Sequence, residues 1–131
     1  MPQTQRSPAR GMGEFRLSET VSEPQWQETV RAECRYYQAL MYHTHDSRRS
    51  DPGLPDCIII TKDNRLLFAE LKRDKTNPEP MQRIWLDALV KVGQQVFVWR
   101  PKDQNEVVDI LEGKPAPEGG WPTRWIPKAT P

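Results

Sequence analysis

The chain has 131 residues, which is enough for one compact domain but not for two of ordinary size. Its formal net charge of +1 excludes the strong overall basicity of a histone-like protein, so any contact with nucleic acid has to use a local basic patch. The two cysteines form neither a CxxC pair nor a disulfide framework, and no run approaches the ~20 apolar residues of a membrane span. Because the N-terminus also has no apolar signal region, we expect a soluble protein in a reducing compartment, the cytoplasm.

The polar ends of the chain are predicted to lie outside the folded domain. Residues 1–18 lack hydrophobic periodicity and contain prolines and glycines, which is typical of a flexible arm. Residues 114–131 are rich in proline, glycine and tryptophan, and we interpret them as a C-terminal tail. Trp121 and Trp125 could dock on the domain or on a partner, and the sequence leaves both open. The remaining residues, 19–113, form the predicted domain.

The domain is predicted to open with an amphipathic helix. Ser22 and Gln25 have the spacing of a capping box, and Pro24 is tolerated in the first turn. Apolar residues then recur at intervals of three and four. These residues are Trp26, Val30, Cys34, Tyr37 and Met41. We therefore expect a helix that continues to Met41 with this stripe in the core, followed by a polar surface loop over residues 42–55.

Strands and helices alternate in the rest of the domain. Apolar and β-branched runs over residues 57–60 and 66–71 flank a hairpin-like turn, so we predict two antiparallel strands. A helix is predicted over residues 79–92 and a third strand over residues 95–99. Because a helix between two strands favours a crossover connection, this strand should be parallel to the second. A short helix near residues 107–111 completes an α/β fold, a mixed sheet flanked by helices in the order α-β-β-α-β-α.

Charged residues gather where the two predicted antiparallel strands open. Pro55-Asp56 stands at the start of the first strand, and Glu70-Leu71-Lys72 stands at the end of the second. Since pairing brings these ends together, Asp56 and Glu70 are predicted to lie within reach of one shared ion. Residues two apart on a strand share a face, so Lys72 should project beside Glu70. The alternative is that Asp56 is a turn residue and that Glu70 and Lys72 are exposed charges on an edge strand.

A hard divalent cation fits this arrangement. Two neighbouring carboxylates repel each other unless positive charge lies between them, and Mg²⁺ or Mn²⁺ prefers oxygen ligands. The predicted ligands are Asp56, Glu70 and the backbone carbonyl of Leu71. Such an ion lowers the pKa of a bound water and polarises a phosphodiester, while Lys72 orients that water or neutralises charge on the phosphate. The pattern favours hydrolysis of a phosphate ester.

Basic and hydroxyl side chains around this cluster are predicted to hold DNA phosphates, because they bind backbone oxygens without reading base sequence. The predicted contacts are His43, Thr44, Ser47, Arg48, Arg49, Ser50, Arg73 and Lys75. Lys62, Arg65 and Arg83 add to the excess of basic over acidic residues between positions 61 and 83. For any one of these residues, the alternative is an ordinary solvated surface charge.

Four residues could suggest other kinds of site. His43 and His45 lack a third ligand at useful spacing, so we do not predict zinc. Trp85 and Trp99 fall on apolar faces of the predicted elements, so we expect them in the core and not as platforms for base stacking.

Several separated motifs occur in a consistent order over residues 22–112. They are Ser22-Glu23 with Gln27, Tyr42-His43-Thr44, the segment SDPGLPD ending at Asp56, LFAELK ending at Lys72, PMQRIWL beginning at Pro80, and VFVWRP ending at Pro101. This combination resembles the VRR-NUC branch of the PD-(D/E)xK nucleases, in the stand-alone form found in bacteriophages and bacteria. Leu54 departs mildly from the family, in which Phe is common before Pro-Asp.

The resemblance implies a restriction-endonuclease-like fold and a nuclease that depends on Mg²⁺ or Mn²⁺. It implies that Asp56 and Glu70 bind the metal and that Lys72 is the catalytic lysine. It adds Glu23 as a further acidic residue and metal ligand, and Gln82 as a residue that faces the site. A homodimer acting on branched DNA, in a bacterial cell or a phage-infected host, is also expected.

Helical geometry distinguishes the three glutamates of the first helix. At ~100° per residue Glu23 lies along the stripe that faces the sheet, whereas Glu28 is rotated by about 140° from it, toward solvent. Glu33 lies nearer the stripe than Glu28, but at ~1.5 Å per residue it is about 15 Å further along the helix. Glu23 is therefore the predicted contributor, and the alternative is that it only complements the helix dipole.

The leading functional hypothesis is an endonuclease that hydrolyses phosphodiesters in branched or otherwise structured DNA, such as flaps or four-way junctions. The main alternative is a catalytically silent DNA-binding or assembly module on the same fold. An enzyme that acts on another phosphate ester is a third, since fold and motif alone do not specify the substrate. The complete set of Asp, Glu and Lys favours the nuclease.

Overall fold

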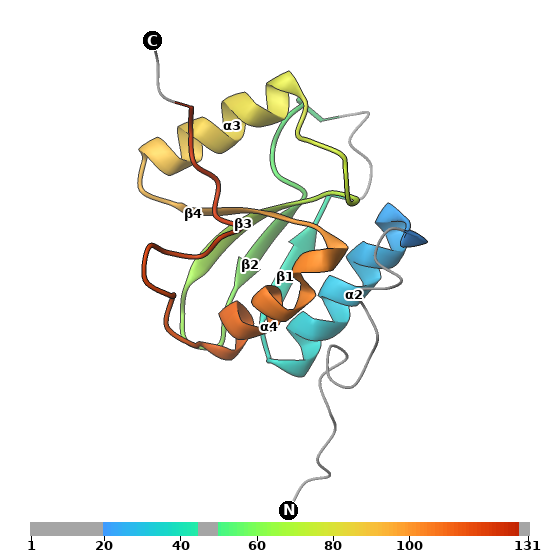
Figure 1. Cartoon of the computed structure of the whole chain (residues 1–131), viewed down its shortest axis with the longest axis vertical. Helices are drawn as coiled ribbons and strands as arrows, with labels where there is room; N and C mark the ends of the chain where they lie inside the picture. Colours follow the sequence, from blue (N-terminus) through green and yellow to red (C-terminus); the bar gives the residue numbers. More distant parts are fainter. Residues whose placement is uncertain (1–19, 45–49, 129–131) are drawn as a thin grey trace, which may run out of the picture.

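The computed structural model describes residues 20–44 and 50–128, and it shows a sheet between two layers of helices (Figure 1). Its main elements are α2 (Glu23–Tyr36), β1 (Leu40–His43), β2 (Cys57–Ile60), β3 (Leu66–Leu71), α3 (Pro80–Lys91), β4 (Gln95–Trp99), the 3₁₀ turn η3 (Pro101–Asp103) and α4 (Gln104–Glu112). The predicted N-terminal arm and the predicted contacts Ser47, Arg48 and Arg49 lie outside the described residues, as does His45. No helix in the described ranges is both long and apolar enough to cross a membrane.

The four strands form one mixed sheet in the order β1-β2-β3-β4. β1 pairs antiparallel with β2, β2 pairs antiparallel with β3, and β4 runs parallel to β3. Helices α2 and α4 cover one face of the sheet and α3 covers the other (Figure 1). The predicted α/β fold, the antiparallel hairpin and the parallel last strand are therefore confirmed.

The first helix is shorter than predicted, and the predicted element order lacks one strand. The helix begins as expected, because Ser22 and Gln25 form the capping box, but it ends at Tyr36. Gln38 then adopts a left-handed φ of 59°, and the chain continues as β1, which pairs with β2. Met41 is thus a strand residue. A strand of four residues is too short to show its period of two against the helical spacing that precedes it.

Two hydrophobic clusters anchor the helices to the sheet. The larger cluster lies between the sheet and the helices α2 and α4, and it contains the fully buried Trp26 and Trp99. The smaller one joins Leu86 of α3 to β4. The core position predicted for Trp99 is confirmed, but the one predicted for Trp85 is wrong, because Trp85 is 38% exposed. One side of α3 packs on the sheet through Leu86. Trp85 precedes Leu86 by one residue, which turns its side chain by ~100° around the helix, away from the sheet.

The C-terminal segment docks on its own domain through β4. The Val98 amide donates to the Thr123 carbonyl (3.1 Å), and the Trp125 amide donates to the Val96 carbonyl (2.8 Å). The Trp125 indole also donates to Asp87 Oδ1 of α3 (2.6 Å). These bonds cover the outer edge of β4, which would otherwise expose unpaired backbone groups.

Candidate active site

Asp56 and Glu70 meet where the hairpin of β2 and β3 opens. Cys57 is paired with Ala69, so the residue before β2 faces the residue near the end of β3. The Asp56 amide donates to Glu70 Oε1 (3.3 Å), and the Leu71 amide donates to Asp56 Oδ2 (2.9 Å). Each carboxylate is therefore held by the backbone of the opposite strand.

Lys72 and Gln82 complete this cluster from two different elements. Lys72 Nζ lies 3.7 Å from Glu70 Oε2, as expected for residues two apart on one strand. Gln82 Nε2 donates to the same Glu70 oxygen (2.8 Å) from the first turn of α3. Gln82 Oε1 accepts from the Glu79 amide (2.8 Å), so the helix cap fixes the orientation of the Gln82 amide. The four predicted residues Asp56, Glu70, Lys72 and Gln82 are brought together.

Burial gives Glu70 unusual electrostatics. Its side chain is only 1% exposed. Desolvation, followed by the nearby charge of Asp56 and a hydrogen bond with that side chain, raises the pKa of Glu70 to about 8, against a partial opposing effect of Lys72. A carboxylate in this position gains from any added positive charge. A strongly perturbed acid beside a second acid and a lysine is typical of a reaction centre.

The donor set at this position fits a hard divalent cation. Asp56 and Glu70 supply oxygen atoms from neighbouring strands, and the carbonyl of Leu71 lies between Glu70 and Lys72 in the chain. Mg²⁺ is commonly held by one or two carboxylates and keeps several waters. Within residues 20–44 and 50–128 no group of three or more His, Cys, Asp or Glu side chains is placed to hold a metal. Asp56 and Glu70 are therefore the two carboxylates that would hold such an ion.

One solved structure of a "VRR_NUC domain" has the same architecture. It superposes with a TM-score of 0.57 and 25% sequence identity, over 66% of this chain and 94% of that one. The chain is therefore similar to a VRR-NUC domain in fold. No family sequence model and no curated protein sequence matches it. This likeness supports a nuclease domain of the PD-(D/E)xK type.

The loop before β2 is shaped by a close contact with α3. Gly53 has a φ of +106°, and a Cβ atom there would lie 2.6 Å from the Met81 carbonyl oxygen and 2.6 Å from the Trp85 ring. Only glycine fits this approach. Pro55 is fully buried and leads directly into Asp56. The Asp-Pro-Gly sequence signals a turn, but sequence reasoning did not identify the contact between Gly53 and α3.

The first turn of α2 is fixed at the same end of the sheet. Trp26 Nε1 donates to the Trp99 carbonyl (2.9 Å), and the Lys72 amide donates to the same carbonyl (3.0 Å). Glu23 lies one helical turn before Trp26 and is half-buried. It does not join Asp56 and Glu70 in a metal-holding group within the described residues, so its role as a ligand stays a prediction.

The other two glutamates of α2 lie as helical geometry predicts. Glu28 is exposed and forms an ion pair with Arg35 at 3.9 Å. Glu33 is buried, and its Oε2 accepts from Gln104 Nε2 of α4 (3.0 Å), on the helix side of the sheet. Neither side chain is part of the cluster around Glu70.

The predicted DNA contacts within the described residues differ in burial and in their distance from the site. The Thr44 amide donates to the Asp56 carbonyl (3.0 Å), which places the end of β1 beside the site. His43 is paired with Cys57, and its Nε2 is buried with no hydrogen-bond partner among the described residues. Ser50, Arg73 and Lys75 have exposed side chains. Their contact with DNA stays a prediction.

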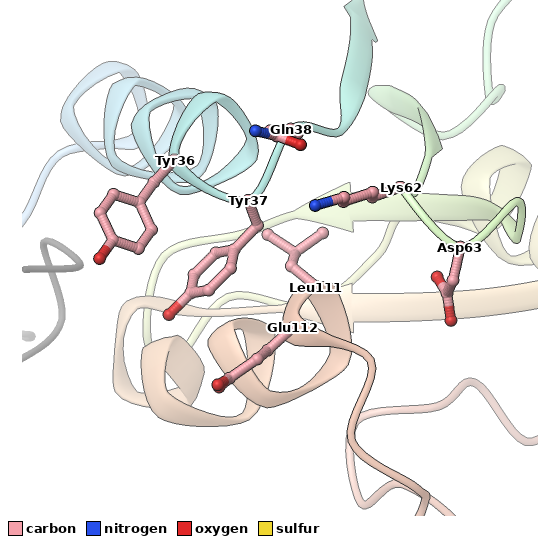
Figure 2. Close-up of a pocket in the computed structure, with 7 residues that line it drawn as sticks. All are labelled: Tyr36, Tyr37, Gln38, Lys62, Asp63, Leu111 and Glu112. Carbon is pink, nitrogen blue, oxygen red and sulfur yellow. The ribbon is translucent and has the colours of Figure 1, made fainter. Parts of the chain in front are cut away.

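Lys62 and Arg65 lie at the far end of the hairpin from Asp56. Arg65 donates through Nε to Asp63 (2.9 Å) and through Nη2 to the Ile110 carbonyl (2.6 Å), so it fastens the turn to α4. Lys62 lines a separate cavity of about 450 Å³, where it extends toward Tyr37 (Figure 2). The basic excess counted along residues 61–83 is therefore split between opposite ends of the sheet.

Proposed function

We propose that this VRR-NUC-like domain is a divalent-metal-dependent endonuclease that hydrolyses phosphodiester bonds in DNA. The observation that carries the proposal is the convergence of Asp56, Glu70 and Lys72 on one point, with Gln82 bonded to Glu70. Asp56, Glu70 and the Leu71 carbonyl would hold Mg²⁺ or Mn²⁺. When bound, such an ion supplies charge that makes a water molecule more acidic and neutralises a phosphodiester.

The protein residues have distinct tasks in this reaction. Lys72 carries its ammonium group beside Glu70 with a side chain that is 12% exposed, so it can balance charge on a phosphate in a largely dry site. Gln82 restrains the Glu70 carboxylate in one orientation. Asp56 is restrained by the Leu71 amide. Held in this way, both carboxylates need little rearrangement when substrate arrives.

Glu23 is proposed as an additional acidic group of the same site. The shared Trp99 carbonyl ties the first turn of α2 to the backbone of Lys72. A carboxylate in that turn would act on the ion through an intervening water, since Mg²⁺ retains waters. Glu23 is therefore proposed as a positioning residue, which acts on the ion through that water.

The direct test is cleavage of linear, flapped and four-way-junction DNA with Mg²⁺, with Mn²⁺ and with EDTA. We expect cleavage with either ion and none with EDTA. Robust cleavage in EDTA would overturn metal dependence. Metal-independent binding of DNA without cleavage under any condition would instead favour the catalytically silent DNA-binding module.

A homodimer that acts on branched DNA forms the finer part of the proposal. Leu40, Ile60 and Leu66 lie opposite one another across β1, β2 and β3, and they are 71%, 45% and 39% exposed. Tyr42, two residues further along β1 and on the same face as Leu40, is also exposed. A contiguous apolar face of this kind suits a symmetric interface, and two copies provide two active sites for the two strands of a junction.

Sedimentation with DNA junctions tests the dimer. We expect two copies per junction, and we expect Leu40→Glu to give monomers. Val92→Glu is the matched control, because Val92 is equally exposed at 71% but lies at the end of α3. A DNA-bound monomer of the unaltered protein, or equal activity on linear duplex, would contradict this part of the proposal.

A further inference from the structure

A cleft between the start of α3 and the C-terminal segment is strongly basic. It has a volume of about 500 Å³ and is formed by the start of α3, the end of β4 and the C-terminal segment. Its cationic lining residues are Arg83, Arg100, Lys102, Arg124 and Lys128, and its acidic one is Asp103. Cations therefore outnumber carboxylates by five to one in the lining of this cleft. We call this cleft the cation groove.

The cationic side chains of the cation groove do not form ion pairs within the described parts of the chain. Within the described parts of the chain, none of the five cations forms an ion pair with a carboxylate within 4.0 Å. Asp103 Oδ2 accepts from the backbone amide of Arg100 (2.9 Å), so this acid serves the local turn. Concentrated like charge in a concave surface focuses the field on an approaching anion.

The arginines of the groove are held in place by carbonyl oxygens. Arg100 Nη2 donates to the Thr76 carbonyl (2.7 Å) and to Asn77 Oδ1 (3.0 Å). Arg83 Nη1 donates to the Pro78 carbonyl (2.8 Å), and Arg124 Nη1 donates to the Trp121 carbonyl (2.9 Å). A guanidinium has five N–H donors, so each arginine retains at least two for a ligand. Because these acceptors are uncharged, they orient the guanidinium groups without cancelling their charge. Side chains that are already oriented lose less entropy when an anion binds.

Two residues of the groove directly follow, in the chain, residues that are bonded to the active-site cluster. Gln82 donates to Glu70, and the next residue, Arg83, lines the groove. The Trp99 carbonyl accepts from the Lys72 amide, and the next residue, Arg100, lines the groove. An extended polyanion that crosses the active site can therefore continue between the start of α3 and the C-terminal segment.

We infer that the cation groove binds the phosphodiester backbone of the DNA substrate beyond the scissile bond. The inference rests on the proposed function for the identity of the polyanion. Cations spread over α3, the end of β4 and the C-terminal segment suit a chain of phosphates better than a single phosphate ion. The C-terminal segment thus has a second task besides covering β4, since it supplies Arg124 and Lys128.

Binding of a labelled duplex and of a labelled single strand, measured by fluorescence anisotropy in EDTA, separates the groove from catalysis. The test variant is Lys102→Glu with Lys128→Glu, and both side chains are exposed. The control is Lys62→Glu with Lys91→Glu, which changes the net charge equally at the hairpin turn and at the end of α3. We expect at least a tenfold loss of affinity for one or both DNAs in the test variant, and less than twofold in the control.

Salt dependence sharpens the result. Because each phosphate contact adds ~0.7–0.9 to the slope of log affinity against log salt, the test variant should lose about 1.5 from that slope. Equal losses in both variants would overturn the inference in favour of a general charge effect. Unchanged DNA affinity in the test variant would overturn it too, and would point to an acidic protein segment as the occupant. Groove-dependent binding without metal-dependent cleavage would sustain the groove while rejecting the nuclease.

Discussion

The hairpin of β2 and β3 carries acidic and basic residues at both of its ends. The pKa of an acidic residue is shifted down at one end and up at the other. At the turn, Asp63 is exposed, and hydrogen bonds from Thr61 and Arg65 lower its pKa. At the open end, Glu70 is buried beside Asp56, and its pKa is raised. The same residue types thus build a stable turn where water and hydrogen-bond partners satisfy them, and a candidate reaction centre where burial disfavours the charged carboxylate.

The largest expected difference between the two ends is in catalysis. Asp56→Asn and Lys72→Ala should each lower kcat/KM by roughly 10²–10³-fold or more, because each removes charge that acts on the phosphate or its ion. Asp63→Asn should leave kcat/KM within twofold. Cleavage kinetics with circular dichroism as a folding check measure this contrast. A loss with Asp63→Asn comparable to that with Asp56→Asn would break the comparison.

The position of the open end depends on the loop that precedes it. Gly53→Ala should lower kcat/KM by about 10²-fold, because the added Cβ would push the loop away from Met81 and displace Asp56. Gly93→Ala is the control, since Gly93 has a similar φ of +90° but nothing within 4 Å of its added Cβ. Similar losses of activity in both variants would assign the effect to backbone strain alone.

The contribution of α2 to the open end is expected to be smaller. Glu23→Gln keeps the size of the side chain but removes its charge, and it should lower cleavage by about 10–100-fold, as is usual for groups that act on a metal site indirectly. Glu28→Gln, on the exposed face with Arg35, should be neutral. Near-normal turnover in Glu23→Gln would show that Glu23 only complements the helix dipole.

The smallest expected effect is on thermal stability as a function of pH. Because the folded pKa of Glu70 is about 8 and its ordinary value is 4.5, the folded protein binds this proton more tightly than the unfolded chain. Its stabilising effect is therefore present below pH 4.5 and is lost as pH rises through about 8. In EDTA, the Tm of the unaltered protein should fall as pH rises from 4.5 to about 8. The Tm of Glu70→Gln should fall less over the same range. A parallel fall in both proteins would exclude Glu70 as the cause.

The cluster that forms the candidate active site was largely predictable because its signals are local. Pro55-Asp56 and Glu70-Leu71-Lys72 flank an apolar hairpin, and antiparallel pairing alone brings their ends together. Gln82 was expected at the site from the family resemblance, and its bond to Glu70 gives that expectation a physical basis. The α/β fold followed from the hydrophobic periods of the same segments.

The features that sequence reasoning did not find depend on contacts distant along the chain. β1 was hidden because Tyr37 and Met41 continue a helical spacing, and the break at Gln38 comes from a left-handed residue that is not glycine. Trp85 looked like a core residue because an apolar helix position does not reveal which side faces the sheet. The docking of residues 123–125 on β4 is decided by an unpaired strand edge, which no local pattern encodes.

That covered edge also limits how far copies of this sheet can associate. Residues 123–125 occupy the outer side of β4, and β1 is the other terminal strand, with no further strand beside it in the described ranges. A sheet with two open edges can add neighbours without limit and grow into a filament, whereas a sheet with one open edge can only close on a single neighbour. The C-terminal segment therefore makes any edge-to-edge assembly of this domain finite, and its removal would turn a self-limiting contact into a propagating one.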